Sequence, residues 1–145
     1  AEVRSSLVAA LAAAAGAAGM VGGQMIDISP ERSGLDLDGI SHLQRLKTGA
    51  LIRFSCQAGA ILAEAGEAEQ AALVAYAEST PEALGKPTGQ DASLGKATFV
   101  GQLGIAAARE KADALVQSAC ARLDLFGEKA DLLRQTAAFV VARRS

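Results

Sequence analysis

The sequence has 145 residues, a formal net charge of −2 at pH 7, 50% hydrophobic residues and only 3% aromatic residues, with no tryptophan. A weakly acidic chain with so few aromatic side chains lacks the basic surface and the stacking platforms of nucleic-acid-binding proteins, so we expect no nucleic-acid partner. The length is that of one domain, and residues 1–145 are predicted to form it. Its alanine-rich core favours packed helices over a sheet.

The N-terminal stretch predicts an alanine-rich helix over residues 3–22, which its glycines then end, followed by a polar loop over residues 27–39. Gly16, Gly19 and Gly23 recur at helical spacing and allow a second backbone to approach. We expect no membrane span or signal peptide here, because alanine and glycine are weakly apolar, the run is shorter than about 20 residues, and Glu2 lies where a positive flank should be.

Four helical segments follow, and no segment alternates with a period of two. We expect helices over residues 40–65 and 67–78, a Gly/Pro-punctuated loop over 79–95, a helix from Lys96 to Gly127, and a last helix over 129–143. Asp36 or Asp38 is the expected N-cap of the first. Apolar seams run through Leu43, Leu51, Phe54, Ala58 and Ile61, and through Ile105, Ala108, Ala112, Leu115, Ala119, Leu123 and Phe126. The predicted fold class is all-α, a helical bundle.

Cysteine and histidine usage indicates no disulfide framework, zinc site or catalytic triad. Cys56 and Cys120 lie far apart among small and apolar neighbours, which suits two free, buried thiols in a reducing compartment such as the cytoplasm, although a disulfide between them stays open. His42 is the single histidine and has no partner at metal-ligand spacing, so we expect it on the surface near a helix start.

Lys47 is the most informative position, because it interrupts the apolar stripe of a predicted helix. Such a lysine either extends its stem outward to water or meets an anion in a cleft. Thr48 adds a hydroxyl donor beside the charge, and Gly49 allows close approach to the helix. An anion site and a snorkelling side chain both remain open at this point.

The predicted loop repeats Leu-Gly-Lys and so supplies Lys86 and Lys96, the second at a helix start that favours anions. It is not a nucleotide P-loop, because five residues separate Gly89 from Gly95 and Ala97 stands where serine or threonine would bind magnesium. An ordinary solvated loop is the alternative. Upstream, Gln24 and Asp27 are one helical turn apart, where they could line a cavity or, for Asp27, cap a helix.

Taken together, several motifs resemble those of the trans-prenyl diphosphate synthases, and most closely the bacterial farnesyl diphosphate synthases. They are GMVGGQMIDI, LKTGALIRFSCQAGAIL, YAE, LGKPTGQDASLGKATFVGQLG and FVVARR. The resemblance implies the isoprenoid synthase fold, an all-α bundle around a deep apolar cavity, usually as a homodimer. It also implies magnesium-dependent ionisation of an allylic diphosphate, addition to isopentenyl diphosphate, and loss of a proton.

The resemblance also assigns candidate substrate-binding roles. Lys47, Thr48 and Lys86 would hold the allylic diphosphate, with Lys47 and Lys86 as the catalytic cations and Lys96 facing the same group. Gln24 and Asp27 match a Gly-Gly-Gln-x-x-Asp motif that lines the cavity. Arg143 matches a C-terminal arginine near the isopentenyl diphosphate.

The main departure is that both aspartate-rich motifs, which bind magnesium in the family, are absent, so we expect no metal ligand in this sequence. The sequence resembles the C-terminal part of a polyprenyl synthetase domain, with an apparent internal gap between Glu78 and Ser79 of roughly four to five helical turns. We expect the 145 residues alone to be inactive and a full-length chain to make farnesyl diphosphate. The alternatives are a geranylgeranyl diphosphate synthase, a non-catalytic partner subunit, or an unrelated helical interaction domain.

Overall fold

The computed structural model describes residues 2–80 and 97–142, and the regular structure in these ranges is helical throughout, as predicted. The α-helices are α1 (Glu2–Ala15), α2 (Met20–Ile28), α3 (Leu37–Gln44), α4 (Ala50–Leu62), α5 (Glu67–Ser79), α7 (Phe99–Leu103), α8 (Ile105–Ala121) and α9 (Asp131–Ala142). Shorter helical turns are η1 (Pro30–Gly34), the π-helical turn η2 (Arg45–Gly49) and η3 (Asp124–Ala130).

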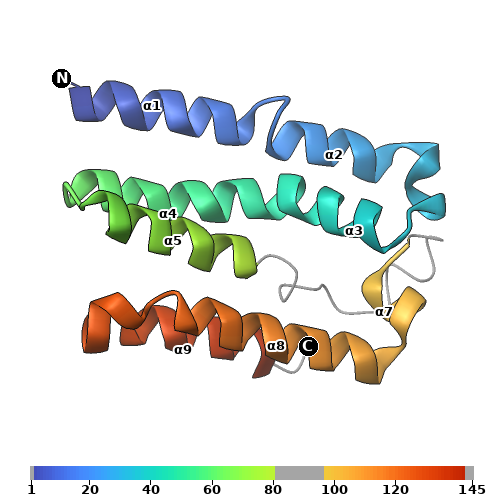
Figure 1. Ribbon diagram of the computed structural model, residues 1–145. Helices are drawn as coiled ribbons and strands as arrows, with labels where there is room; N and C mark the ends of the chain where they lie inside the picture. Colours follow the sequence, from blue (N-terminus) through green and yellow to red (C-terminus); the bar gives the residue numbers. More distant parts are fainter. Residues whose placement is uncertain (1, 81–96, 143–145) are drawn as a thin grey trace.

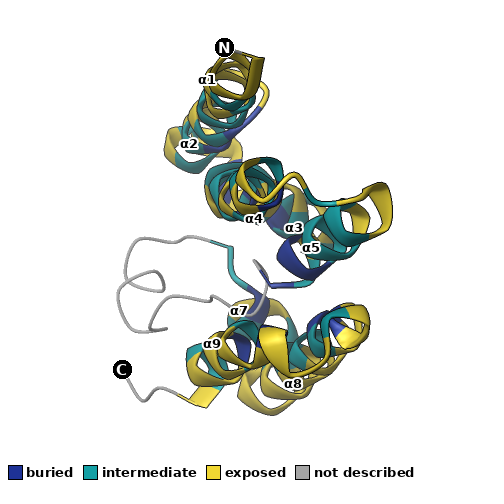
Figure 2. Cartoon of the chain, turned by 90° about the vertical axis from the view of Figure 1, so that its left-hand side faces the viewer, coloured by how far each residue is buried: buried dark blue, intermediate teal, exposed yellow. Residues whose placement is uncertain are grey.

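The helices form three layers. In Figure 1, α1 and α2 lie end to end above α3 and α4, which run in the opposite direction. Helix α5 lies beside α4 in the middle layer, and α8 and α9 form the third layer (Figure 2). Helix α5 joins the middle and third layers, because it packs against both α4 and α8.

The N-terminal helix ends earlier than predicted, and the expected helix over residues 3–22 is wrong in its boundaries. The chain turns between Ala15 and Met20, and α2 then continues through Gly23 to Ile28. Glycine is a poor helix former, but α2 is held by packing against η2. Asp27 therefore stands in a helix rather than at the start of a polar loop.

One stretch of the described residues, Glu2–Ile28, is long and apolar enough to cross a membrane when judged by length and composition only, with a mean hydropathy of 1.7. It lies near the N-terminus, and 11% of its apolar window is buried. The turn between α1 and α2 divides it (Figure 1). The absence of a membrane span therefore stays a prediction.

The predicted helix over residues 40–65 is an α–π–α run that begins at Leu37 and ends at Leu62. Asp36 is its N-cap, as predicted, because the Asp36 carboxylate accepts a 2.8 Å hydrogen bond from the backbone nitrogen of Gly39. The π-helical turn in the middle adds residues relative to an α-helix and so shifts the register of the apolar stripe. The spacing of apolar residues in the sequence did not predict the π-helical turn.

A hydrophobic core lies between the second and third layers. It consists of Tyr76, Ala119, Leu123, Ala130 and Ala137. The Tyr76 hydroxyl donates a 2.8 Å hydrogen bond to the carbonyl of Leu133 and so fastens α5 to α9. Both cysteines are free, as predicted, and partly buried at the edge of this core.

The helix predicted from Lys96 to Gly127 was wrong in its extent. Gly104, at φ +80°, separates α7 from α8, and α8 ends at Ala121, before Gly127. A φ in this region favours glycine, which explains the break at Gly104. The predicted seam holds at Ala119 and Leu123, but Ile105 is 69% exposed.

Candidate functional site: a cation cluster on Asp27

Lys47 neither extends freely into water nor lies unpaired among apolar side chains. It stands in η2, and its ammonium nitrogen donates a 2.7 Å hydrogen bond to Oδ2 of Asp27. The Lys47 side chain remains 25% exposed, whereas that of Asp27 is 10% exposed. The ammonium is therefore held from the protein side while part of the side chain stays open to a second anion. π-helical turns occur frequently at functional sites, where they re-aim side chains.

A buried glycine makes this contact possible. Gly23 of α2 packs so closely on η2 that a Cβ atom added there would lie 2.3 Å from the backbone nitrogen of Lys47. The glycine spacing in the sequence predicted a close backbone approach in this stretch, and the structure confirms it at Gly23. Because the backbones of α2 and η2 lie in close contact at Gly23, the side chain of Asp27, one turn later, can reach Lys47.

Arg32 completes the arrangement, and the sequence reasoning missed it. Its side chain is 11% exposed, and its Nε lies 3.1 Å from Oδ1 of Asp27. A terminal guanidinium nitrogen also donates to the carbonyl oxygen of Ala97. The sequence did not single out Arg32, because residues 27–39 were predicted to be a polar loop. In the structure Pro30 starts the turn η1, and Arg32 is buried in that turn. The only available signal was Pro30, which lies six residues before the helix cap Asp36.

Asp27, Arg32 and Lys47 form what we call the Asp27 cluster. Each of the two carboxylate oxygens of Asp27 faces one cation. Two cations and one carboxylate leave a formal charge of +1 on the cluster. A partly buried site with surplus positive charge attracts anions, and phosphate groups most of all when ammonium and guanidinium donors are both present.

The other predicted site residues fall into two groups. Gln24 is half-buried on α2, one turn before Asp27, and Thr48 is exposed in η2 beside Lys47, so both lie on the elements that form the Asp27 cluster. Lys86, Lys96 and Arg143 lie outside the described residues. His42 is exposed on α3, as predicted.

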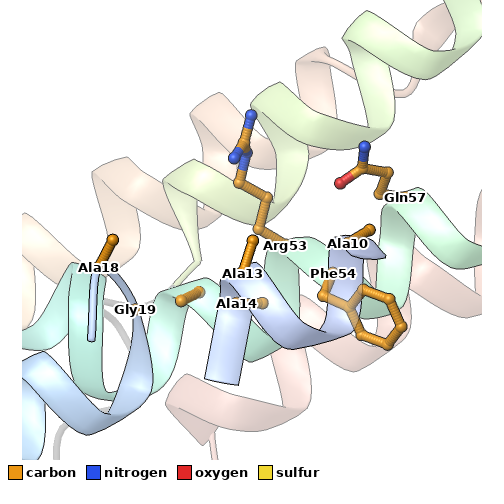
Figure 3. Close-up of a pocket in the computed structure, with 9 residues that line it drawn as sticks. Ala10, Ala13, Ala14, Ala18, Gly19, Arg53, Phe54 and Gln57 are labelled. Atoms are coloured by element: carbon orange, nitrogen blue, oxygen red, sulfur yellow. The ribbon is translucent and has the colours of Figure 1, made fainter. Parts of the chain in front are cut away.

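A cavity of about 330 Å³ lies elsewhere, between α1 and α4. Figure 3 shows its alanine-rich wall with Arg53, Phe54 and Gln57 around it. Gln24, Asp27, Lys47 and Thr48 do not line it. The Asp27 cluster is the stronger candidate site, because charged donors at hydrogen-bond distance define a binding chemistry and an open alanine-lined hollow does not.

The described residues do not fit a magnesium site. Within residues 2–80 and 97–142, no group of three or more His, Cys, Asp and Glu side chains is placed to hold a metal ion. Magnesium takes carboxylate oxygens, but both oxygens of Asp27 already face cationic side chains. No step is therefore assigned to a metal at the Asp27 cluster.

The layered helices define an all-α protein, and the Asp27 cluster is its candidate site. Residues 4–133 match the polyprenyl synthetase family, and the chain belongs to that family. It is 37% identical to farnesyl diphosphate synthase of Escherichia coli strain K12, covering 87% of this chain and 48% of that protein. It superposes with a TM-score of 0.86 on an FPP/GFPP synthase from Zymomonas mobilis, at 45% identity, covering 97% of this chain and 51% of that one.

A third relative bears on the predicted internal gap. Geranylgeranyl diphosphate synthase of Cyanophora paradoxa is 32% identical over 162 residues, which takes in 100% of this chain and 54% of that protein. Since this chain has 145 residues, the matched region is 17 residues longer than the chain itself. The alignment length does not place these residues in the chain, so the gap between Glu78 and Ser79 stays a prediction. The chain spans about half the length of the relatives that it matches.

Proposed function

We propose that the complete protein is a prenyltransferase that condenses isopentenyl diphosphate with an allylic diphosphate, dimethylallyl or geranyl, to give farnesyl diphosphate. The observation that carries the proposal is Lys47, held by Asp27 in the π-helical turn of a chain that belongs to the polyprenyl synthetase family. Similarity to farnesyl diphosphate synthases supports the choice of product.

In this proposal, Lys47 binds the diphosphate of the allylic substrate. Negative charge builds up on that group as the carbon–oxygen bond breaks, and a fixed cation stabilises such charge better than mobile water does. Asp27 fixes the Lys47 ammonium in place before the substrate arrives. Thr48, Lys86 and Lys96 are proposed as further ligands of the same diphosphate, Gln24 as a lining residue, and Arg143 as a contact of isopentenyl diphosphate.

Magnesium, a homodimeric state and a cytoplasmic location belong to the same proposal and rest on the resemblance to the family and, for the location, on the free thiols. The described residues do not supply magnesium ligands. We propose that the 145 residues alone are inactive, because neither aspartate-rich motif of the family occurs in the sequence.

The experiment is an assay of the complete encoded protein with isopentenyl diphosphate, geranyl diphosphate and magnesium, with the products separated by chain length. A C15 product supports the proposal, and a C20 product favours the geranylgeranyl alternative, which similarity to the Cyanophora paradoxa enzyme keeps in view. The chain of residues 1–145 is assayed beside it and is expected to give no product.

A second candidate function is a non-catalytic partner that binds a prenyl synthase subunit. This candidate rests on the sequence, which contains neither aspartate-rich motif of the family. The two candidates differ in one outcome: the partner gives no product alone under any metal concentration but changes the rate or product length of an active synthase when the two are mixed.

A further inference from the structure

We propose that Arg32 is a positioning residue whose charge keeps Lys47 available to a diphosphate. The inference rests on the proposed function of Lys47 and concerns a residue that no sequence motif singled out. Its basis is the geometry of the Asp27 cluster, in which one carboxylate is shared between the two cations.

Asp27 by itself would both orient Lys47 and reduce its effective charge. A carboxylate 2.7 Å from an ammonium with 25% of its side chain exposed holds that ammonium in place. It also neutralises much of the charge that an arriving diphosphate would meet. A two-member pair of Asp27 and Lys47 would therefore be well oriented but a weak anion site.

Arg32 forms a second ion pair with Asp27. Its Nε lies 3.1 Å from Oδ1, on the oxygen that Lys47 does not use. Because Arg32 offsets the charge of Asp27, the cluster keeps a formal charge of +1 and Lys47 keeps its orientation. A guanidinium stays charged at every physiological pH, so this compensation does not switch off.

The guanidinium of Arg32 is held in place by burial and by a second hydrogen bond. Arg32 is 9% exposed, and its terminal nitrogen donates to the carbonyl of Ala97 on the chain that leads into α7. The planar fork of arginine serves the carboxylate and this carbonyl together, which a lysine ammonium does less well because it lacks fixed donor directions. Arg32 therefore has a charge role at Asp27 and a structural role at Ala97, and substitutions can separate the two.

The test measures binding of inorganic pyrophosphate to the complete encoded protein by isothermal titration calorimetry, both without metal and with magnesium. Arg32→Met leaves a neutral Asp27–Lys47 pair and is expected to weaken binding about tenfold. Arg32→Lys keeps the charge but loses the fork, so it is expected to lower the melting temperature while binding stays within about twofold of the wild type. A loss in Arg32→Lys as large as in Arg32→Met would overturn the charge role.

A double variant keeps the proposal testable if Arg32→Met folds poorly. Asp27→Asn with Arg32→Met removes a carboxylate and a cation together and restores the formal charge of +1 through Lys47. It is expected to bind pyrophosphate within about threefold of the wild type, whose cluster has the same formal charge. A loss of about tenfold or more relative to the wild type would overturn the charge role of Arg32.

The matched control is Arg134, which also joins a carboxylate to backbone carbonyls. It donates to Asp131, Gly127 and Leu123. Arg134→Met is expected to lower the melting temperature and leave pyrophosphate binding unchanged. If the wild type binds no pyrophosphate, or if Lys47→Gln does not weaken binding, the proposed function fails. If Lys47→Gln weakens binding and Arg32→Met does not, only the role of Arg32 fails.

Discussion

The ammonium nitrogen of Lys47 lies 2.7 Å from Oδ2 of Asp27, which joins two helical elements across 20 residues of sequence. This ion pair fixes a cation that would otherwise be a long, flexible side chain with four rotatable bonds, and so reduces the conformational entropy that binding must overcome. It also links stability to function, because the residues that orient Lys47 also hold α2 against η2.

Removing the carboxylate tests that link. Asp27→Asn leaves Arg32 and Lys47 without their shared counter-ion, and we expect it to lower the free energy of unfolding by about 3 kcal/mol, because partly buried charges lose their partner. Urea denaturation measures the change. The control is Glu78→Gln, which breaks an exposed pair with Arg53 and is expected to cost less than about 1 kcal/mol. Equal losses in both variants would contradict the account.

Two glycines should respond to alanine in opposite ways. Gly23→Ala places a methyl group against the backbone of Lys47 and is expected to destabilise the fold by at least about 2 kcal/mol. Gly59→Ala meets nothing within 4 Å inside α4 and should stabilise by about 0.5–1 kcal/mol, since alanine is the better helix former. Thermal unfolding followed by circular dichroism gives both signs, and a stable Gly23→Ala would rule out the close α2–η2 contact.

The raised pKa of Tyr76 predicts that the protein loses stability at alkaline pH. Burial, followed by the nearby thiols of Cys56 and Cys120, raises the pKa of Tyr76 to about 12 from 10.0. Because the folded state keeps its proton longer, the stabilisation is complete below pH 10 and is lost as the pH rises toward 12. Residues 1–145 contain a single tyrosine, so the ultraviolet absorbance titration of the 145-residue chain reports Tyr76 alone. A midpoint near the ordinary value would show that the α5–α9 core is open.

The Tyr76 hydroxyl also provides a matched variant for that titration. Tyr76→Phe removes the hydrogen bond to the carbonyl of Leu133 while keeping the ring in the core. We expect unfolding free energies measured in urea between pH 9 and 12 to fall less steeply in Tyr76→Phe than in the wild type. Identical slopes would mean that other groups control the alkaline limit.

The junction between Glu78 and Ser79 has a direct chemical test. We expect that peptide mapping of the complete encoded protein by mass spectrometry finds additional residues after Glu78, because the family resemblance predicts a helix there that this sequence lacks. A peptide in which Ser79 directly follows Glu78 would contradict that expectation and favour the non-catalytic partner.

Much of the fold could be predicted from the sequence, because helix caps and apolar spacing act locally. Asp36 capped the helix that it was expected to cap, and the seam at Ala119 and Leu123 is buried. Helix ends were less predictable. Glycine ended a helix at Gly104, where φ is positive, but not at Gly23, where packing against η2 holds the helix together.

The candidate site was predictable only in part. Lys47 drew attention because a lysine on an apolar stripe needs an anion, and Asp27 was recognised through a motif, yet nothing in the sequence paired them. The pairing depends on the π-helical turn, which has no sequence period of its own. Arg32 was missed because its partners, Asp27 and Ala97, are 5 and 65 residues away, so its role depends on tertiary structure.

The most direct measurement of the central claim is kcat/KM for geranyl diphosphate in the complete encoded protein, compared with its Lys47→Gln variant. If Lys47 binds the departing diphosphate, kcat/KM falls by roughly 100-fold, as expected when a charged group that stabilises the leaving group is lost. Lys129→Gln, at an exposed lysine in η3, is the control and should leave the rate unchanged. A Lys47→Gln variant with wild-type kcat/KM would contradict the account.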